Sequence, residues 1–447
     1  MLPRSISRKD FIKNSSVLLA AGSGLLATAG PAAAADNRTA PLAGKTLTLK
    51  NVRLETGFEY DNEGDVVATK TELFTIEIRD GKIGAVLPNN PSAKGVDAKG
   101  LLALPAFKEM HIHLDKTYYG DKWKATGKRQ GGVKGMIALE QQIIPELLKN
   151  STYKAEKLIE LLQSNGSNIA RSHVNIEPTS KLDSLKHLQK ALENKKDSFE
   201  AELVAFPQHG LYYTDSTGLM KDAAQMGVDY IGGLDPASID GSIEKSMDFV
   251  VQLALDYNKG IDIHLHESGE SGVKTIEYLI NKVNENPALK GKTFISHCFA
   301  LAHIDRKKLE EVAEKMGNAK MGVMSTIPFG GTIMPIPTLY KYGVDVRAGN
   351  DCIIDHWNTF GSGSVLQKTN LAAQLYGYRT EFDLSRILKL ATHNVLPLDD
   401  KGNRQWPRTG DKADLVLMDA SCSAEAVSRI SPVRSLIHRG TIVFSKS

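Results

Sequence analysis

The sequence predicts an α/β protein: a (β/α)8 TIM barrel with a small β-sandwich domain built from both ends of the mature chain. Two observations lead to this fold class. Between residue 105 and about residue 395, short apolar stretches alternate with longer charged helical stretches, as in repeated βα units. On both sides of that region the sequence alternates between apolar and polar residues like exposed strands. We therefore predict sandwich segments at 36–104 and 396–447 around a barrel at 105–395.

Eight apolar stretches are the candidate barrel strands. They are short, as buried parallel strands are, and charged helical stretches such as Ala155–Ser164, Lys181–Asn194 and Arg306–Met316 separate them. Because the active site of such a barrel lies at the carboxyl ends of its strands, the residues there are the candidate functional residues. The strands are predicted at Ala106–His111, Ile169–Val174, Leu203–Phe206, Tyr230–Gly232, Ile261–Leu265, Thr293–His297, Lys320–Met324 and Asp345–Ala348.

The flanking regions carry the signs of antiparallel strands. Lys45–Thr56 alternates, and Leu73–Leu87 reads as two strands around the turn pair Asp80-Gly81. Near the other end, three further strands are predicted at Ala413–Met418, Ser435–His438 and Thr441–Ser445. One small sandwich that joins both regions is the economical arrangement.

Composition and charge narrow the class of partner. The chain has 447 residues, of which 41% are hydrophobic and 24% are charged, as in ordinary soluble globular proteins. The net charge of +3 is located entirely in residues 1–35, and the remainder is balanced. Nothing in this charge balance suggests nucleic acid or an anionic membrane as the partner. The sequence leaves a homo-oligomer open.

Residues 1–35 read as an export signal peptide. A basic start leads into the apolar stretch Val17–Ala27, and small residues up to Ala35 offer a cleavage site. Ser7–Lys13 resembles the twin-arginine export motif, with lysine in place of the second arginine. We expect an exported protein (periplasm, cell envelope or secreted), with the twin-arginine route as the candidate. The apolar stretch is too short and too rich in glycine for a stable membrane span after cleavage.

The cysteines predict neither a disulfide framework nor a cysteine-based zinc site. Cys298, Cys352 and Cys422 are odd in number, far apart and in no CxxC pattern.

A metal site is predicted at the strand ends. His111 and His113, two residues apart at the end of the first barrel strand, point to one face and can share an ion. More histidines and an aspartate follow at the ends of later strands, namely His173, His209, His264, His266, His297 and Asp351. Three histidines and one carboxylate bind a divalent metal and leave a position for water, whose pKa the metal lowers. A glutamate beside such a metal, as in the fragment that ends at Glu267, can shuttle a proton to a leaving group.

Five fragments in this order resemble the amidohydrolase superfamily, most closely its cytosine deaminase branch. Each fragment is modest alone, but together they span the barrel at strand-like intervals. They are HIHLDKT at 111–117, FPQ-G at 206–210, DIH--E at 262–267, SH at 296–297, and GND followed by D-W at 349–357.

The resemblance implies a role for each matching residue. One Zn or Fe ion would be held by His111, His113, His264 and Asp351. Glu267 would carry a proton from the metal-bound water to a ring nitrogen of the substrate. His297 would orient the hydroxide, and Asp351 would assist the proton transfer. In the pocket, Gln208 would bind an amide-like edge of the substrate and Trp357 would form a wall.

Three positions refine what the resemblance implies. Residues 203–210 contain no lysine to bridge two metals, which favours one ion. Asn350 and Cys352 flank Asp351 where the cytosine deaminase branch carries histidine and a second aspartate. Cys352 would lie at the substrate without the charge of that aspartate, so a related heterocycle is expected rather than cytosine itself. Lys116 is expected to orient a loop.

The predicted function is hydrolytic deamination of an aminated nitrogen heterocycle of the cytosine type by attack of metal-bound hydroxide, with Glu267 as proton shuttle. Asn350 and Cys352 motivate an alternative within the superfamily: cleavage of a cyclic amide or removal of an N-alkyl amine. A third alternative is an exported binding protein without turnover. The presence of every expected ligand and of Glu267 argues against this last alternative.

Overall fold

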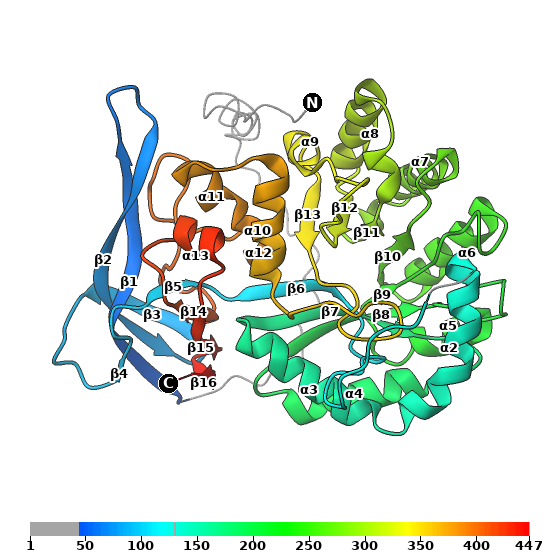
Figure 1. Ribbon diagram of the computed structural model, residues 1–447, viewed down its shortest axis with the longest axis horizontal. Coiled ribbons are helices and arrows are strands. Elements are labelled where there is room, and N and C mark those ends of the chain that lie inside the picture. Colours follow the sequence, from blue (N-terminus) through cyan, green and yellow to red (C-terminus); the bar gives the residue numbers. More distant parts are fainter. Residues whose placement is uncertain (1–43, 129–130, 447) are drawn as a thin grey trace, which may run out of the picture.

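The computed structural model describes residues 44–128 and 131–446 (Figure 1). The predicted export signal at 1–35 lies outside the described residues. The chain forms a parallel barrel and a separate sheet, which contains the blue and red strands in Figure 1. Over the described residues, every helix is too short or too polar to cross a membrane.

All eight predicted barrel strands are present, and they pair in the order of the sequence. Their side chains are largely buried on both faces, as the apolar runs predicted; β10 and β11 are buried at every position. The strands are β6 (Phe107–Ile112), β7 (Ser167–Asn175), β8 (Glu200–Phe206), β9 (Tyr230–Ile231), β10 (Gly260–Leu265), β11 (Thr293–His297), β12 (Gly322–Ser325) and β13 (Asp345–Ala348).

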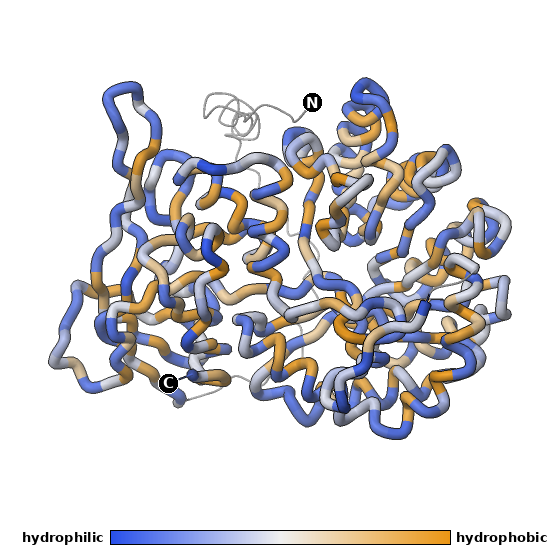
Figure 2. The backbone as a smooth tube through the Cα atoms, in the orientation of Figure 1, coloured by the Kyte–Doolittle hydropathy of each residue, from blue (hydrophilic) through white to orange (hydrophobic). Residues whose placement is uncertain are grey.

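The helices between these strands bury one apolar stripe each. In α8, Leu309, Val312 and Met316 are buried at helical spacing, and the carboxylate of Asp305 caps the first turn by accepting from Lys308 N at 3.0 Å. Figure 2 shows this alternation of hydrophobic and hydrophilic stretches along the outer helices. The helices are α2 (Gly132–Leu148), α3 (Ser151–Ser164), α4 (Asp183–Lys195), α5 (Thr217–Ala224), α6 (Ile243–Asp256), α7 (Glu270–Glu285), α8 (Arg306–Asn318) and α9 (Ile336–Lys341).

The separate sheet contains strands from both ends of the described chain, in the order β16-β15-β14-β5-β1-β2-β3, with β4 paired to β1. Its centre is the antiparallel pairing of β14 with β5, so the predicted fold class is confirmed. The domain limits near 104 and 396 stay predictions. The strands are β1 (Thr46–Tyr60), β2 (Val66–Arg79), β3 (Lys82–Pro88), β4 (Val96–Asp97), β5 (Leu102–Pro105), β14 (Leu415–Met418), β15 (Val433–His438) and β16 (Thr441–Ser445).

Four helices lie between the barrel and this sheet in Figure 1, where they are coloured orange to red. One of them, α13, separates β14 from β15, a stretch for which the sequence pattern predicted only strands. The helices are α10 (Val365–Tyr376), α11 (Glu381–Ile387), α12 (Lys389–Thr392) and α13 (Ser423–Arg429).

The barrel closes where the chain after β13 meets β6. Asp351 N donates to His111 O at 2.8 Å, and His113 N donates to Asp351 O at 3.4 Å. Gly349 makes this approach feasible, because a Cβ there would lie 2.5 Å from both the nitrogen and the oxygen of His111. Three of the four predicted metal ligands therefore lie at the closing seam of the barrel.

We expect Gly349→Ala to lower the free energy of unfolding by about 2 kcal/mol or more, because the added methyl group forces the seam apart. The Gly349→Ala variant should also lose its bound metal. Urea unfolding and metal analysis check both effects. Gly218→Ala in α5 is the control, since its Cβ would have no neighbour within 4 Å. Equal stability of the two variants would contradict the role of the seam.

Candidate metal centre and its pocket

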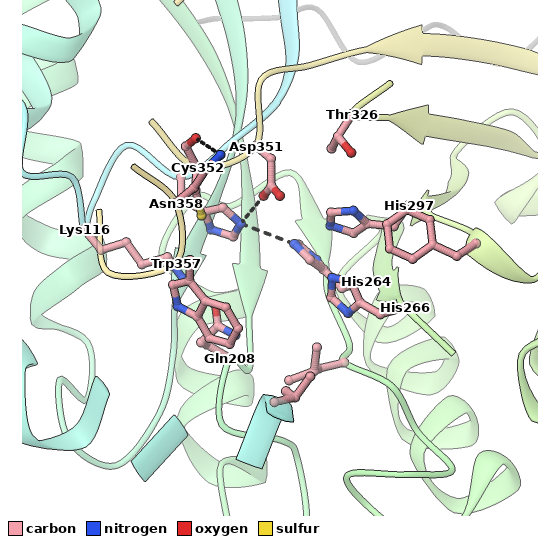
Figure 3. Close-up of a pocket in the computed structure, with 14 residues that line it drawn as sticks. Lys116, Gln208, His264, His266, His297, Thr326, Asp351, Cys352, Trp357 and Asn358 are labelled. Carbon is pink, nitrogen blue, oxygen red and sulfur yellow. Dashed lines mark hydrogen bonds and ion pairs between the residues drawn. The ribbon is translucent and has the colours of Figure 1, made fainter. Parts of the chain in front are cut away.

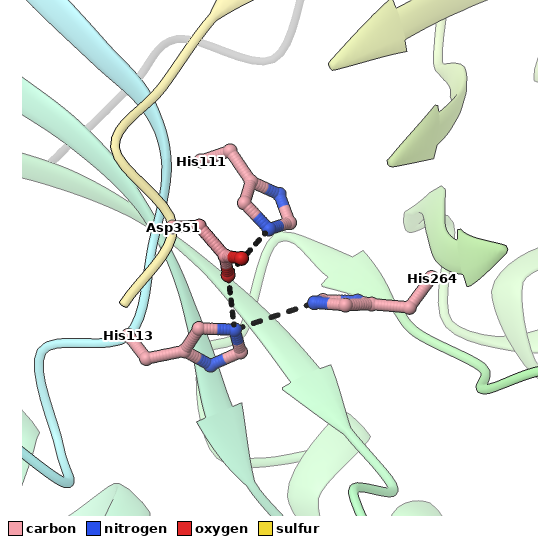
Figure 4. A group of neighbouring side chains, drawn as sticks. All are labelled: His111, His113, His264 and Asp351. Carbon is pink, nitrogen blue, oxygen red and sulfur yellow. Dashed lines mark hydrogen bonds and ion pairs between the residues drawn. The ribbon is translucent and has the colours of Figure 1, made fainter. Parts of the chain in front are cut away.

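The structure brings the four predicted ligands together. The ligand atoms of His111, His113, His264 and Asp351 all lie within 4.8 Å of one another (Figure 4). The Nε2 atoms of His111 and His113 are each 3.4 Å from Asp351 Oδ1. The Nε2 atoms of His264 and His113 are 3.3 Å apart.

The separations of 3.3 and 3.4 Å fit a single divalent cation. In a tetrahedral site with metal–nitrogen distances of about 2.0–2.1 Å, neighbouring ligand atoms lie about 3.3–3.4 Å apart. His111 Nε2 is also buried without a hydrogen-bond partner in the described chain. A buried nitrogen of this kind is costly unless an ion or a hydrogen bond satisfies it. The four side chains therefore have the geometry of a metal site, and His111 offers a buried nitrogen that an ion would satisfy.

The protonation states favour metal binding. Burial, with help from the charge of Lys116, lowers the pKa of His113 to about 3. Burial and the neighbouring imidazoles hold the pKa of His264 well below its ordinary value. For Asp351, burial acts to raise the pKa, but the surrounding histidines outweigh it and keep the pKa well below the usual range. Neutral imidazoles and an ionised carboxylate are the forms that bind metal.

A relay of side chains below the cluster fixes the orientation of His111. Ser296 Oγ donates to Asp262 Oδ1 at 2.7 Å and lies 2.8 Å from His111 Nδ1. The hydroxyl oxygen is therefore free to accept a hydrogen bond from Nδ1–H, which leaves the lone pair of Nε2 directed at the cluster. Asp262 is held in turn by an ion pair of 3.0 Å with the fully buried Arg171. The fragment SH at 296–297 was noted in the sequence, but nothing in it indicated that the hydroxyl of Ser296 would orient His111.

We expect Ser296→Ala to weaken metal affinity by about tenfold, because His111 loses the acceptor that fixes its tautomer. Ser325→Ala is the matched control, since Ser325 is equally buried at the end of β12 and its hydroxyl accepts only from Ile327 N in the described chain. Competition with a coloured chelator measures both affinities. Equal affinities would show that the relay does not support the ligand.

A cavity of about 420 Å³ adjoins the cluster (Figure 3). The structure places the predicted His297, Gln208, Cys352 and Trp357 on its walls. The complete lining within the described residues is His113, Lys116, Val133, Gln208, Leu234, His264, His266, His297, Phe299, Thr326, Asp351, Cys352, Trp357 and Asn358.

Glu267, the predicted proton shuttle, is not part of this lining. Its Oε1 accepts from Ser238 N at 2.7 Å, in the loop that follows β9. Its Oε2 is buried without a hydrogen-bond partner in the described chain. The neighbouring His266 lines the cavity and is held by Asp235, whose Oδ2 is 2.8 Å from His266 Nδ1. Glu267 is thus one residue from the wall, and its role as a shuttle stays a prediction.

Asn350 does not face the cavity. Its backbone N donates to Glu109 Oε1 at 2.8 Å and its Nδ2 to Glu109 Oε2 at 2.5 Å, under the barrel seam. Burial raises the pKa of Glu109 to about 7. Of the two residues that flank Asp351, only Cys352 can therefore meet a ligand.

A buried carboxylate supports the opposite wall of the cavity. Glu140, on α2, is completely buried, and its Oε1 lies 3.5 Å from Lys116 Nζ. Four more side chains direct nitrogen at the same carboxylate: Asn175 at 2.8 Å, Trp357 at 3.3 Å, His356 at 3.4 Å and His209 at 3.6 Å. The sequence analysis missed Glu140. The pattern that could have revealed it is its position between Ile137 and Ile144 on the apolar face of the helix.

His209 lies between two of these buried acids. Its Nδ1 is 3.1 Å from Glu177 and its Nε2 is 3.6 Å from Glu140. Burial acts to lower the pKa of His209, but Glu140 and Glu177 overcome it and raise the pKa to about 9. At neutral pH, His209 is therefore an imidazolium that helps to support the cavity wall.

We expect this imidazolium to make stability depend on pH. The folded protein holds the proton up to about pH 9 and the unfolded chain only to about pH 6.5, so the stabilisation is complete below 6.5 and disappears as the pH rises through 9. The loss amounts to about 3 kcal/mol at most. The free energy of unfolding, measured by denaturation between pH 6 and 10, should fall in this way in the wild type. In His209→Gln this fall should be absent. The exposed His303→Gln serves as control, and an unchanged slope in His209→Gln would contradict the assignment.

The chain is similar to known proteins in sequence and in fold. It is 47% identical to the uncharacterized protein YahJ of Escherichia coli (strain K12) over 99% of both chains. The solved structure of N-isopropylammelide isopropylaminohydrolase from Burkholderia multivorans ATCC 17616 superposes with a TM-score of 0.77 at 26% identity, covering 90% of this chain and 98% of that chain. For 5-methylcytosine deaminase from Klebsiella pneumoniae liganded with 5-fluorocytosine the TM-score is 0.73 at 23% identity, with the same coverage, which indicates a shared fold.

The profile of the Amidohydrolase family matches residues 154–444, which include most of the barrel and the last strands of the separate sheet. The resemblance based on the five sequence fragments is thereby confirmed. The chain belongs to the amidohydrolase family.

Proposed function

We propose that the protein is a metal-dependent hydrolase that deaminates an aminated nitrogen heterocycle related to cytosine. Family membership supports hydrolysis of C–N bonds other than peptide bonds. The observation that carries the proposal is the convergence of His111, His113, His264 and Asp351 beside a cavity of about 420 Å³. A cavity of this size accommodates a small ring compound.

In the proposed reaction, water replaces the amine on a ring carbon, and ammonia leaves. The four ligands would hold a Zn or Fe ion, which would supply a water of lowered pKa as the nucleophile at ordinary pH. The chain supplies the remaining steps. His297, on the cavity wall, orients the attacking water. Glu267 carries the proton from that water to a ring nitrogen, and Asp351 assists this proton transfer.

The side chains opposite the metal ligands hold the ring. Figure 3 shows Lys116, Gln208 and Trp357 on one side of the cavity, with His264, His266 and His297 on the other. The indole of Trp357 is fixed by its hydrogen bond to Glu140 and presents a flat apolar face. Cys352 offers a neutral contact beside Asp351. Export of the enzyme, by the twin-arginine route, is part of the same proposal and rests on residues 1–35 alone.

The test combines metal analysis with a product screen. We expect about one Zn or Fe ion per chain and release of ammonia from at least one aminopyrimidine, aminotriazine or pterin. Glu267→Gln should keep the metal and lose about a hundredfold or more in kcat, because general acid–base catalysis is removed. Glu270→Gln, at the exposed start of α7, is the matched control. A wild type without bound metal, or full activity in Glu267→Gln, would contradict the proposal.

Loss of an N-alkyl amine is the second candidate reaction. The relative of Burkholderia multivorans is named for release of an isopropylamino group, and its structure covers 90% of this chain. The attack on the ring carbon is the same, and only the leaving group differs. Mass analysis of the products separates the two reactions, because an alkylamine is then released in place of ammonia. Tight ligand binding without any product would instead indicate a binding protein.

A further inference from the structure

The segment 119–128, which follows the carboxyl end of β6, carries positive charge that its surroundings do not neutralise. Three exposed lysines lie in it: Lys122, Lys124 and Lys128. Its only acidic residue is Asp121, which forms an ion pair of 2.8 Å with Lys154 of α3. Within residues 44–128 and 131–446, none of the three lysines forms an ion pair. The balanced total charge of the sequence therefore hides a local excess of positive charge.

A cavity of about 290 Å³ adjoins this segment and is suited to an anion. Its two acidic residues, Asp121 and Glu146, are each paired with a lysine of the same wall. Lys122 and Lys124 also line the cavity, and in the described chain they have no carboxylate partner. Helix α3 begins there with Asn150 as its N-cap and without an acidic residue in its first turn. A phosphate group would meet two unpaired ammonium groups and the start of a helix, which attracts anions.

The most exposed large hydrophobic side chains in the described part of the chain lie at the same end of the barrel. They are Phe360, Trp123 and Phe329, with 80%, 75% and 73% of their surface exposed. Each lies on a loop that follows a barrel strand, and the strands concerned, β13, β6 and β12, are neighbours around the seam. Thr126 N donates to Thr359 Oγ1 at 2.9 Å, which joins the loop of Trp123 to that of Phe360. Exposed aromatic rings gathered in this way indicate an interaction surface.

We propose that a basic-aromatic patch, formed by Lys122, Trp123, Lys124 and Phe360, docks the protein on an anionic lipid surface. The lipid phosphates lie at the two lysines and in the adjoining cavity. The two aromatic rings lie among the headgroups, where the apolar ring and the N–H group of an indole are both satisfied. Attraction to anionic lipids and burial of apolar surface add to each other in such binding. This docking is separate from the reaction at the metal site, and neither depends on the other.

A second copy of the chain and a nucleic acid fit the basic-aromatic patch less well. In a symmetric dimer formed through this patch, the lysines of one copy would face those of the other, and like charges repel. Single-stranded nucleic acids bind in a charged groove that stacks their bases on aromatic rings. Trp123 and Phe360 are instead largely exposed on loops. An anionic lipid surface satisfies both the lysines and the rings.

The test measures sedimentation of the full chain with lipid vesicles. Vesicles of phosphatidylglycerol and phosphatidylcholine in equal parts should bind the protein about tenfold or more tightly than vesicles of phosphatidylcholine alone, because each lysine near an anionic surface contributes about fivefold. Added salt should weaken this binding, since it screens the charges. Residues 1–35 are themselves basic and apolar, so all variants keep the same N-terminus. Equal binding to the two kinds of vesicle would overturn the proposal.

A pair of double variants isolates the charge of the patch. Lys122→Gln combined with Lys124→Gln should lower the affinity for the vesicles with phosphatidylglycerol by about tenfold or more. Lys190→Gln combined with Lys290→Gln is the matched control, because both lysines are exposed and form no ion pair in the described chain. This control removes the same charge from α4 and from the segment before β11, and should change the affinity by less than about threefold. Equal affinities in the two double variants would overturn the proposal.

The fluorescence of Trp123 reports contact with lipid directly. Vesicles with phosphatidylglycerol should shift the emission of the wild type to shorter wavelengths, and Trp123→Phe should remove this shift. The chain has three tryptophans; Trp406 is buried, Trp357 donates to Glu140, and residues 1–35 contain none. An unchanged emission with vesicles would overturn the proposal. A shift caused by raising the protein concentration alone would assign the patch to a second copy, and an equal shift with a single-stranded oligonucleotide would assign it to nucleic acid; either result overturns the proposal too.

Discussion

The closure of the barrel is the constraint on which the site depends. The backbone of Asp351 pairs with both His111 and His113, so the register that closes the barrel also sets the spacing of three ligands. Asp351 and His297 have φ values of 65° and 67°, which a residue other than glycine adopts only when its surroundings enforce it. For Asp351, the hydrogen bonds of the seam supply that enforcement. The ligand atoms are therefore positioned before any ion arrives.

The two sides of the cavity have different structural origins. The metal side is built from strand ends, whose positions are fixed by hydrogen bonding within the barrel. The opposite side is built from loops that converge on Glu140 of α2, through Lys116 and Trp357. A change in the loops can therefore alter which ring is held while the ligand geometry stays the same. Such separation allows one barrel to serve many related substrates.

Strand positions could be predicted from the sequence because they follow short-range rules, and the full set of metal ligands was implied by the family resemblance of five fragments. Apolar runs locate the strands, and the two-residue period places His111 and His113 on one face. The direction of Asn350 could not be predicted, because the backbone of the next residue, Asp351, is left-handed (φ 65°) and breaks the strand pattern; Asn350 contacts Glu109 instead of the cavity. The relay from Ser296 to Asp262 and the contact of Lys116 with Glu140 join residues far apart in sequence. No local pattern encodes such partners.

The pairing of β14 with β5 has a consequence for biosynthesis. One edge of β5 pairs with β1, which precedes it in the chain. The other edge can pair only after β14, Leu415–Met418, has been synthesised. While the ribosome makes the whole barrel, the apolar Leu102–Pro105 therefore presents open backbone groups to any neighbouring nascent chain. A chain shortened before residue 415 would keep that edge permanently. Its fate would be set by self-association or proteolysis, even with every metal ligand present.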